Sequence, residues 1–136
     1  VFATVADGKP AVCAIRGSDP VFATRVRCFA PAAAPPGFGR SLAACDVDGE
    51  GKDEVLVGTT SDGVYVVSFG VEPAAGELLT GAHGAAVTTI YPGRPGPAVW
   101  AASMTSGAGI AIYKGKTRLN DVKPPPLAGL YGISIR

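Results

Sequence analysis

Short apolar runs separated by small polar turns recur along the chain. Three segments of this kind can be laid over one another: PAVCAIRGSDPVFATRV from residue 10, DEVLVGTTSDGVYVVSF from residue 53 and PAVWAASMTSGAGIAIY from residue 97. Each contains an apolar run of about five residues, a turn rich in Ser, Asp and Gly, and a second apolar run. Because these turn residues accept the backbone angles of tight turns, every segment predicts a β-hairpin.

The spacing of the hairpins predicts the architecture. The alignment makes Val12, Val55 and Val99 equivalent, at steps of 43 and 44 residues. The second strand of each hairpin then begins at Val21, Val64 or Ile110. A period of this length with paired strands matches a four-stranded propeller blade, and the chain lacks the periodicity of helical repeats. We therefore predict an all-β chain, a partial β-propeller of about three consecutive blades, each with three to four antiparallel strands.

The whole chain, 1–136, is expected to be a single propeller fragment with blade-like units at about 1–40, 41–86 and 87–136. Four strands are expected in the central unit: Ser41–Cys45, Glu54–Gly58, Val64–Phe69 and Gly76–Thr80. The next unit begins at Val87, and a last strand is expected at Leu130–Ile135. The following residues are expected to be buried between sheets: Val55, Val57, Val64, Val66, Val99, Trp100 and Ile112.

Composition and charge narrow the class of partner. The chain is 47% hydrophobic and has a formal net charge of +1, which gives no reason to expect nucleic acid as a partner. No apolar run reaches the roughly 18 to 20 residues that a transmembrane helix needs. The chain begins at Val1 without methionine, so we expect a fragment or a processed product, with the remaining propeller blades missing. Other protein subunits are the expected partners.

The cysteines point to a reducing compartment. Cys13, Cys28 and Cys45 are odd in number and lack CxxC spacing, and His83 is the only histidine. Neither a disulfide framework nor a zinc site is therefore expected. Buried thiols in an intracellular protein fit this pattern best, although a removed signal peptide would change it.

One acidic loop carries the most specific motif of the chain. The stretch DVDGEGKDE from Asp46 leads directly into an apolar strand, and its oxygen side chains alternate as they do at the start of calcium loops. An EF-hand requires a bidentate Glu at the twelfth position, where this chain has Val57. The alternative is a metal-free turn in which the carboxylates accept backbone N–H groups.

The segment SLAACDVDGEGKDEVLVGTTSDGVYVV resembles the FG-GAP or VCBS repeat of integrin-α-like β-propellers. This resemblance implies a calcium loop between the first two strands of a blade, with four side chains and the Lys52 carbonyl as ligands. The implied ligand residues are Asp46, Asp48, Glu50, Lys52 and Glu54. Glu50 and Glu54 stand where the family often has Asp, and VADGKPAV and YPGRPGPAV, the corresponding segments of the other units, have lost the acids.

Among such propellers, one acidic loop, cysteines in strands and no disulfide pattern look more like intracellular adaptor subunits than integrin ectodomains. The run SLAACD from Ser41, followed by Val87-Thr88-Thr89 at the start of the next unit, is similar to the intracellular propellers of BBSome (Bardet–Biedl syndrome) subunits. This resemblance implies a non-enzymatic protein–protein interaction scaffold in a multi-subunit assembly of ciliary or membrane trafficking, in the cytoplasm or cilium. The alternative is an extracellular, calcium-dependent adhesion or carbohydrate-binding propeller.

No catalytic residue is expected. His83 has no partner histidine or nearby acid, and Ser41 lies in GRSLA, which lacks the second glycine of a nucleophile elbow. The Gly107–Gly109 turn precedes a strand, so it presents no helix N-terminus to a phosphate. We therefore expect a protein that is not an enzyme, with calcium as its one candidate cofactor.

Overall fold

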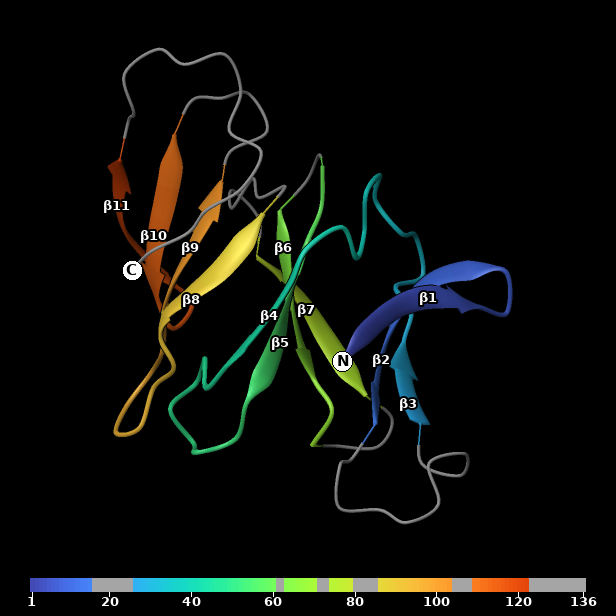
Figure 1. Cartoon of the computed structure of the whole chain (residues 1–136), viewed down its shortest axis with the longest axis horizontal. Coiled ribbons are helices and arrows are strands. Elements are labelled where there is room, and N and C mark those ends of the chain that lie inside the picture. Colours follow the sequence, from blue (N-terminus) through green and yellow to red (C-terminus); the bar gives the residue numbers. More distant parts are fainter. Residues whose placement is uncertain (16–25, 61–62, 71–73, 80–85, 104–108, 123–136) are drawn as a thin grey trace.

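All regular structure in the described part of the chain is β-strand. The computed structural model describes residues 1–15, 26–60, 63–70, 74–79, 86–103 and 109–122 (Figure 1). Within these ranges the strands are β1 (Phe2–Ala6), β2 (Lys9–Ile15), β3 (Val26–Phe29), β4 (Leu42–Cys45), β5 (Glu54–Gly58), β6 (Val64–Ser68), β7 (Ala75–Leu79), β8 (Val87–Tyr91), β9 (Val99–Ser103), β10 (Ile110–Lys114) and β11 (Thr117–Val122). The prediction of an all-β chain is confirmed for these residues. None of them lies in a helix that could cross a membrane.

The strands form three antiparallel sheets in which each strand pairs with the next one along the chain. The N-terminal sheet has the order β1-β2-β3, the central sheet β4-β5-β6-β7, and the C-terminal sheet β11-β10-β9-β8. Figure 1 shows the central sheet, drawn in green, between the other two. This agrees with the predicted sheets of three to four antiparallel strands.

The central sheet is buried on both faces because it packs against a sheet on each side. Neighbouring residues of a strand point to opposite faces, and all of β5 is buried. Val55 and Val57 pack with Val12 of the N-terminal sheet. Leu56, between them in sequence, packs with Trp100 of the C-terminal sheet. Double-sided burial explains why VLVG is an unbroken apolar run rather than an alternating one.

Most strands of the central sheet lie within a residue or two of their predicted bounds. Val64 and Ile110 begin strands as predicted. Val21, Thr80, His83 and the expected strand at Leu130–Ile135 lie outside the described residues. The sequence pattern did not reveal β1 or β11. For β11 the reason is that the strand is exposed along its whole length and its sequence, TRLNDV, has no apolar run.

The predicted equivalence of Val12, Val55 and Val99 is wrong in detail. In the central sheet Leu42 pairs with Val57, and in the C-terminal sheet Val87 pairs with Ala102. Equivalent residues of the two sheets are therefore 45 positions apart. Under this step the equivalent of Val55 is Trp100 rather than Val99. A slip of one residue exchanges the two faces of a strand. Val99 therefore points away from the central sheet, and it is only half-buried.

The N-terminal sheet also aligns differently from the prediction. Phe29 of β3 lies against Gly76 of β7, where an added Cβ atom would meet its ring, so β3 lies beside the last strand of the central sheet. By strand order, β2 then corresponds to β6 rather than to β5, which contains Val55. The alignment failed because a four-stranded meander contains three successive hairpins, and an apolar–turn–apolar pattern does not say which hairpin it belongs to.

The predicted core is confirmed for five of its residues and fails for two. Val55, Val57, Val64, Val66 and Trp100 are buried. Val99 and Ile112 are half-buried, because both lie on the outward face of the C-terminal sheet. They were expected between sheets because their neighbours along the chain are strongly apolar, but alternation places them on the other face.

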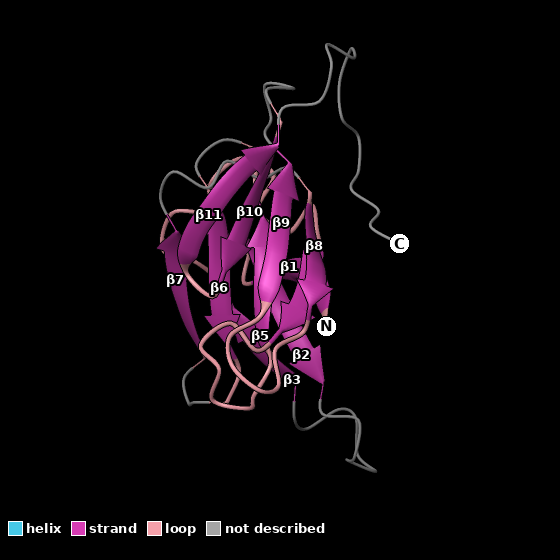
Figure 2. Cartoon of the chain, turned by 90° about the vertical axis from the view of Figure 1, so that its left-hand side faces the viewer, coloured by secondary structure: helices cyan, strands magenta, loops and turns pink. Residues whose placement is uncertain are grey.

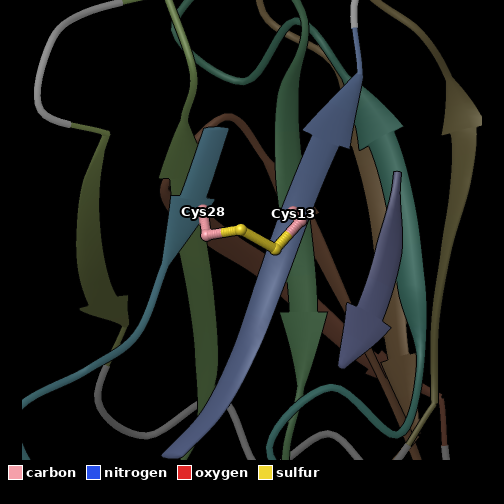
Figure 3. The surroundings of a disulfide bond; sticks show 2 residues. All are labelled: Cys13 and Cys28. Carbon is pink, nitrogen blue, oxygen red and sulfur yellow. A yellow bond between two sulfur atoms is a disulfide. The ribbon is translucent and has the colours of Figure 1, made fainter. Parts of the chain in front are cut away.

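The prediction of unpaired cysteines is wrong for two of the three. Cys13 of β2 and Cys28 of β3 face each other in adjacent strands, with Cα atoms 4.1 Å apart, and form a disulfide (Figure 3). The odd count misled because two cysteines pair and one remains, and the strand register that brings them together cannot be read from their spacing. Cys45 is a buried free thiol, as expected.

Candidate metal centre

The acidic loop joins β4 to β5 of the central sheet. Cys45, the last residue of β4, pairs with Glu54, the first residue of β5. This pairing places Asp46, which follows β4, beside the Glu54 side chain. The two acids are nearly inaccessible to solvent, with Asp46 1% and Glu54 6% exposed.

Backbone N–H groups of the loop donate to these carboxylates and fix its shape. The two oxygens of Asp46 accept hydrogen bonds from the amides of Gly49 and Gly51, each at 2.8 Å. Glu54 accepts one from the Val47 amide at 2.9 Å. Buried amides need such partners, so the carboxylates stabilise the turn whether or not an ion is bound.

Two glycines allow the chain to turn this sharply. Gly49 and Gly51 have φ angles of 83° and 85°, in the left-handed region that L-residues with a Cβ atom disfavour. Gly49 also lies close to the loop between β8 and β9, where an added Cβ atom would be 3.0 Å from the Pro97 nitrogen. The loop is therefore shaped by its own acids and by contact with the C-terminal sheet.

Three of the five predicted ligand residues come together. Asp46, Asp48 and Glu54 each offer a carboxylate oxygen, and these oxygens lie within 4.8 Å of one another. Glu50 is exposed and does not belong to this cluster, although its amide donates to Asp48 at 2.9 Å. Lys52 is also exposed. The structure therefore brings together three of the four implied carboxylates. The Lys52 ligand that the motif implies is a backbone carbonyl, which this grouping of side chains does not include.

The electrostatics of the cluster disfavour three bare negative charges. Burial raises the pKa of Glu54, the hydrogen bond from the Val47 amide opposes this rise, and the nearby charges of Asp48 and Asp46 add to it. Carboxylate oxygens are the ligands that calcium prefers, and a divalent cation would offset their repulsion. The chemistry of the donor set therefore fits a hard cation such as calcium.

A pocket of about 200 Å³ opens beside the cluster and is lined by two of its acids, by β6 and β7 of the central sheet, and by the turn between β10 and β11. The lining residues are Val47, Asp48, Glu54, Val66, Ser68, Ala75, Gly76, Glu77 and Lys116. Lys116, in the turn between β10 and β11, forms an exposed ion pair with Glu77 of β7. Sequence reasoning missed Glu77 and Lys116, because the two residues meet only when two separate sheets pack together.

The side chains of Ser41 and Cys45 could in principle act as nucleophiles, but their surroundings indicate a structural role. The Ser41 hydroxyl accepts a hydrogen bond from the Val87 amide at 3.0 Å, which ties β4 to β8. Burial raises the pKa of the Cys45 thiol to about 11, and thiolates rather than thiols are the reactive form.

Comparisons with known proteins leave the chain unassigned. No protein-family model, curated protein or solved structure matches it.

Proposed function

We propose that the chain is a non-enzymatic protein–protein interaction scaffold, in which the three sheets are consecutive blades of an FG-GAP-type β-propeller with one calcium-binding loop. The supporting observation is the contact between the first strands of two successive sheets. Besides the Ser41–Val87 hydrogen bond, the Thr89 hydroxyl of β8 donates to the Ala44 carbonyl of β4 at 3.0 Å. Propeller blades are four-stranded sheets arranged around a central channel, and first strands that lie side by side fit this arrangement.

The acidic loop directly follows the first of these strands, β4, which supports its assignment as the calcium loop of the repeat. It also contacts the next sheet: the Asp46 amide donates to the Pro92 carbonyl at 2.9 Å, and the Ala98 amide donates to the Asp46 carbonyl at 2.7 Å. An ion bound by Asp46, Asp48 and Glu54 would therefore strengthen both the turn and the contact between two sheets.

Calcium titration with thermal unfolding tests the metal site. At a hundredfold excess over the dissociation constant, calcium should raise the free energy of unfolding by about 2.7 kcal/mol. Magnesium should stabilise less, because it demands a smaller octahedral cage. Asp48→Asn should abolish the calcium response. Glu50→Gln should leave it intact if only the three clustered carboxylates bind, and should weaken it if the five-residue set applies.

Asp7→Asn is the matched control, since Asp7 is an exposed acid in the turn between β1 and β2 and does not belong to the cluster. If millimolar calcium changes neither the melting temperature nor the heat of titration, the loop is a metal-free turn. The scaffold proposal would then lose its calcium component.

The disulfide favours the extracellular alternative over an intracellular adaptor. The intracellular expectation rested on unpaired cysteines, and disulfides persist mainly in oxidising compartments. An extracellular scaffold with a calcium loop is therefore our second candidate, and the Cys13–Cys28 pair is the observation that supports it.

Thiol labelling distinguishes the two compartments. Protein taken directly from its producing cells and denatured without reductant should accept one maleimide, at Cys45, and should accept three after reduction. Three labels before reduction would contradict the extracellular candidate and return the proposal to a reducing compartment.

A further inference from the structure

The turn between β10 and β11 is fixed against the acidic loop. The Gly115 amide donates to the Ala98 carbonyl at 2.8 Å, and the Gly115 carbonyl accepts the Trp100 indole N–H at 2.8 Å. A Cβ atom added at Gly115 would lie 2.9 Å from the carbonyl oxygen of Val47, so the backbone of the turn directly contacts the acidic loop. These contacts fix the position of the next residue, Lys116, beside the candidate metal centre.

Lys116 brings a positive charge to the pocket beside the cluster. Figure 2 looks onto the C-terminal sheet, with β6 and β7, which line the pocket from the central sheet, behind β10 and β11. Three acids, Asp48, Glu54 and Glu77, line the same pocket. The Lys116 ammonium forms an ion pair with Glu77, and the two side chains are 48% and 57% exposed. Water screens an ion pair with this exposure, so little free energy is needed to break it.

The charges around the pocket are unbalanced. Besides the three acids of the lining, Asp46 belongs to the same carboxylate cluster. Lys116 is the one cation among the described residues that line the pocket. An ammonium relieves part of the repulsion between these carboxylates when no ion is bound. The same positive charge repels a divalent cation that approaches the same acids.

We propose that Lys116 is a tethered cation that competes with a divalent cation for the acids around this pocket, and thereby lowers the calcium affinity of the acidic loop. The inference rests on the proposed calcium site and adds its regulation by the neighbouring sheet. Without calcium, Lys116 links the β10–β11 turn to β7 through Glu77. Calcium binding drives the ammonium toward solvent, which its exposed side chain permits, so the ion and this contact between two sheets oppose each other.

Calcium titration calorimetry at low salt tests the competition. Lys116→Gln should bind calcium about three- to tenfold more tightly than the unaltered chain, because the repulsion between the ammonium and the ion is removed. The gain should shrink in 1 M salt, where the screening length falls to about 3 Å. Thermal unfolding gives a second readout. The variant should melt below the unaltered chain in the presence of a chelator, where its acids have lost their cation, and above it in excess calcium.

Lys114→Gln and Lys116→Arg are the matched controls. Lys114 is exposed at the end of β10 and does not line the pocket, and its neighbour Tyr113 packs toward the central sheet, so Lys114 points away from that sheet. Lys114→Gln loses the same charge and should bind calcium within about twofold of the unaltered chain. Lys116→Arg keeps the charge and should do the same. Lys116→Met, which keeps much of the alkyl chain, replaces Lys116→Gln if circular dichroism shows that variant to be unfolded.

The outcomes separate this inference from the calcium proposal. Equal calcium affinities of the unaltered chain and Lys116→Gln would overturn the competition and leave the calcium site intact. An equal gain for Lys114→Gln would also overturn it, because net charge rather than the pocket would then set the affinity. Calcium binding by Lys116→Gln alone would support the competition and contradict the calcium component of the proposed function. Absence of binding in both proteins at millimolar calcium would overturn both proposals.

Discussion

The loop between β4 and β5 and the loop between β8 and β9 occupy the same place in adjacent sheets but are stabilised differently. In the acidic loop, the Asp46 and Glu54 carboxylates accept backbone amides of the loop itself. The second loop, residues 92–98, contains Pro92, Pro95 and Pro97 and no acid. Its described internal hydrogen bond, from the Arg94 amide to the Gly96 carbonyl, is 3.2 Å long, whereas its bonds to Asp46 are 2.7 and 2.9 Å.

The comparison shows how equivalent loops of two adjacent sheets can differ, with a cluster of acids in one and none in the other. The acidic loop supports its own turn, and its carboxylates remain together as a candidate cation site. The proline loop is held by prolines, which restrict the backbone, and by docking on its neighbour. The proline loop therefore needs no acids to keep its shape, because its prolines and its contact with Asp46 supply the order.

The largest predicted effect concerns Trp100, which is linked through Gly115 to the end of the proline loop, residues 92–98. Trp100 is fully buried, stacks on Tyr113, and donates its indole N–H to the Gly115 carbonyl at 2.8 Å. The Gly115 amide in turn donates to Ala98 at the end of the loop. Trp100→Ala should lower the free energy of unfolding by about 3–5 kcal/mol, measured by urea denaturation.

Trp100→Phe is the control, because it keeps an aromatic ring and removes the N–H group. It should cost less than the alanine variant, by the loss of one hydrogen bond and some packing. A loss below about 1 kcal/mol for Trp100→Ala would show that the proline loop and the core beneath it are independent.

Alanine substitutions at two glycines of the proline loop distinguish the contact between this loop and Asp46 from the strain of a positive φ angle. Gly93 and Gly96 both have φ of 84°, so alanine at either should cost about 1–2 kcal/mol. An added Cβ at Gly93 would lie 2.7 Å from the Gly96 carbonyl oxygen and 2.9 Å from the Asp46 carbonyl oxygen. An added Cβ at Gly96 would have no atom within 4 Å. Overpacking should make Gly93→Ala worse than Gly96→Ala by about 1–3 kcal/mol.

The measurement is again the free energy of unfolding of both variants under identical conditions. Equal losses would mean that the proline loop can move away from Asp46 without penalty. The docking of one loop on the other would then be a weak contact, and the contrast drawn between the two loops would disappear.

The central sheet could be predicted from sequence because its surroundings are simple. Both faces of β5 are covered, so an unbroken apolar run marks it regardless of register. At the two ends of the stack each sheet packs against one other described sheet, and the register decides which residues point toward it. Val99 and Trp100 are adjacent, and the apolar pattern could not tell which of them faces the core.

The candidate site was predictable only as far as it is local. Asp46, Asp48 and Glu54 are close in sequence, and a turn with glycines brings them together. Lys116 and the Cys13–Cys28 pair depend on how separate strands meet, which no spacing rule contains. Glu50 fits the motif but is exposed and lies outside the cluster, and the spacing of the acids alone does not say which of them come together.

Replacing Tyr113, which stacks on Trp100, should have a smaller effect on stability, and this effect should depend on pH. Its hydroxyl is buried and has no hydrogen-bond partner among the described residues, so Tyr113→Phe should change stability at neutral pH by less than about 1 kcal/mol. Burial raises the pKa of Tyr113 above its ordinary value. Above about pH 10 the unfolded chain loses this proton before the folded chain does, so stability falls as pH rises.

Tyr113→Phe should remove that part of the alkaline loss. The test is the difference in unfolding free energy between the two proteins from pH 8 to pH 11, which should change in favour of the variant above about pH 10. Parallel profiles would show that the hydroxyl ionises as easily in the folded chain as in the unfolded one.

The smallest predicted effect is the direct link between the two loops. Arg94 of the proline loop and Asp53 of the acidic loop form an ion pair at 2.8 Å, with side chains 58% and 48% exposed. Water and salt screen such a pair, so a double-mutant cycle of Arg94→Ala and Asp53→Ala should give a coupling of about 0.2–1 kcal/mol. The coupling should shrink in 1 M salt, where the screening length falls to about 3 Å. If the coupling is larger than this and insensitive to salt, the loops are joined by their charges, and the proline loop docks through Arg94 rather than through the Asp46 backbone.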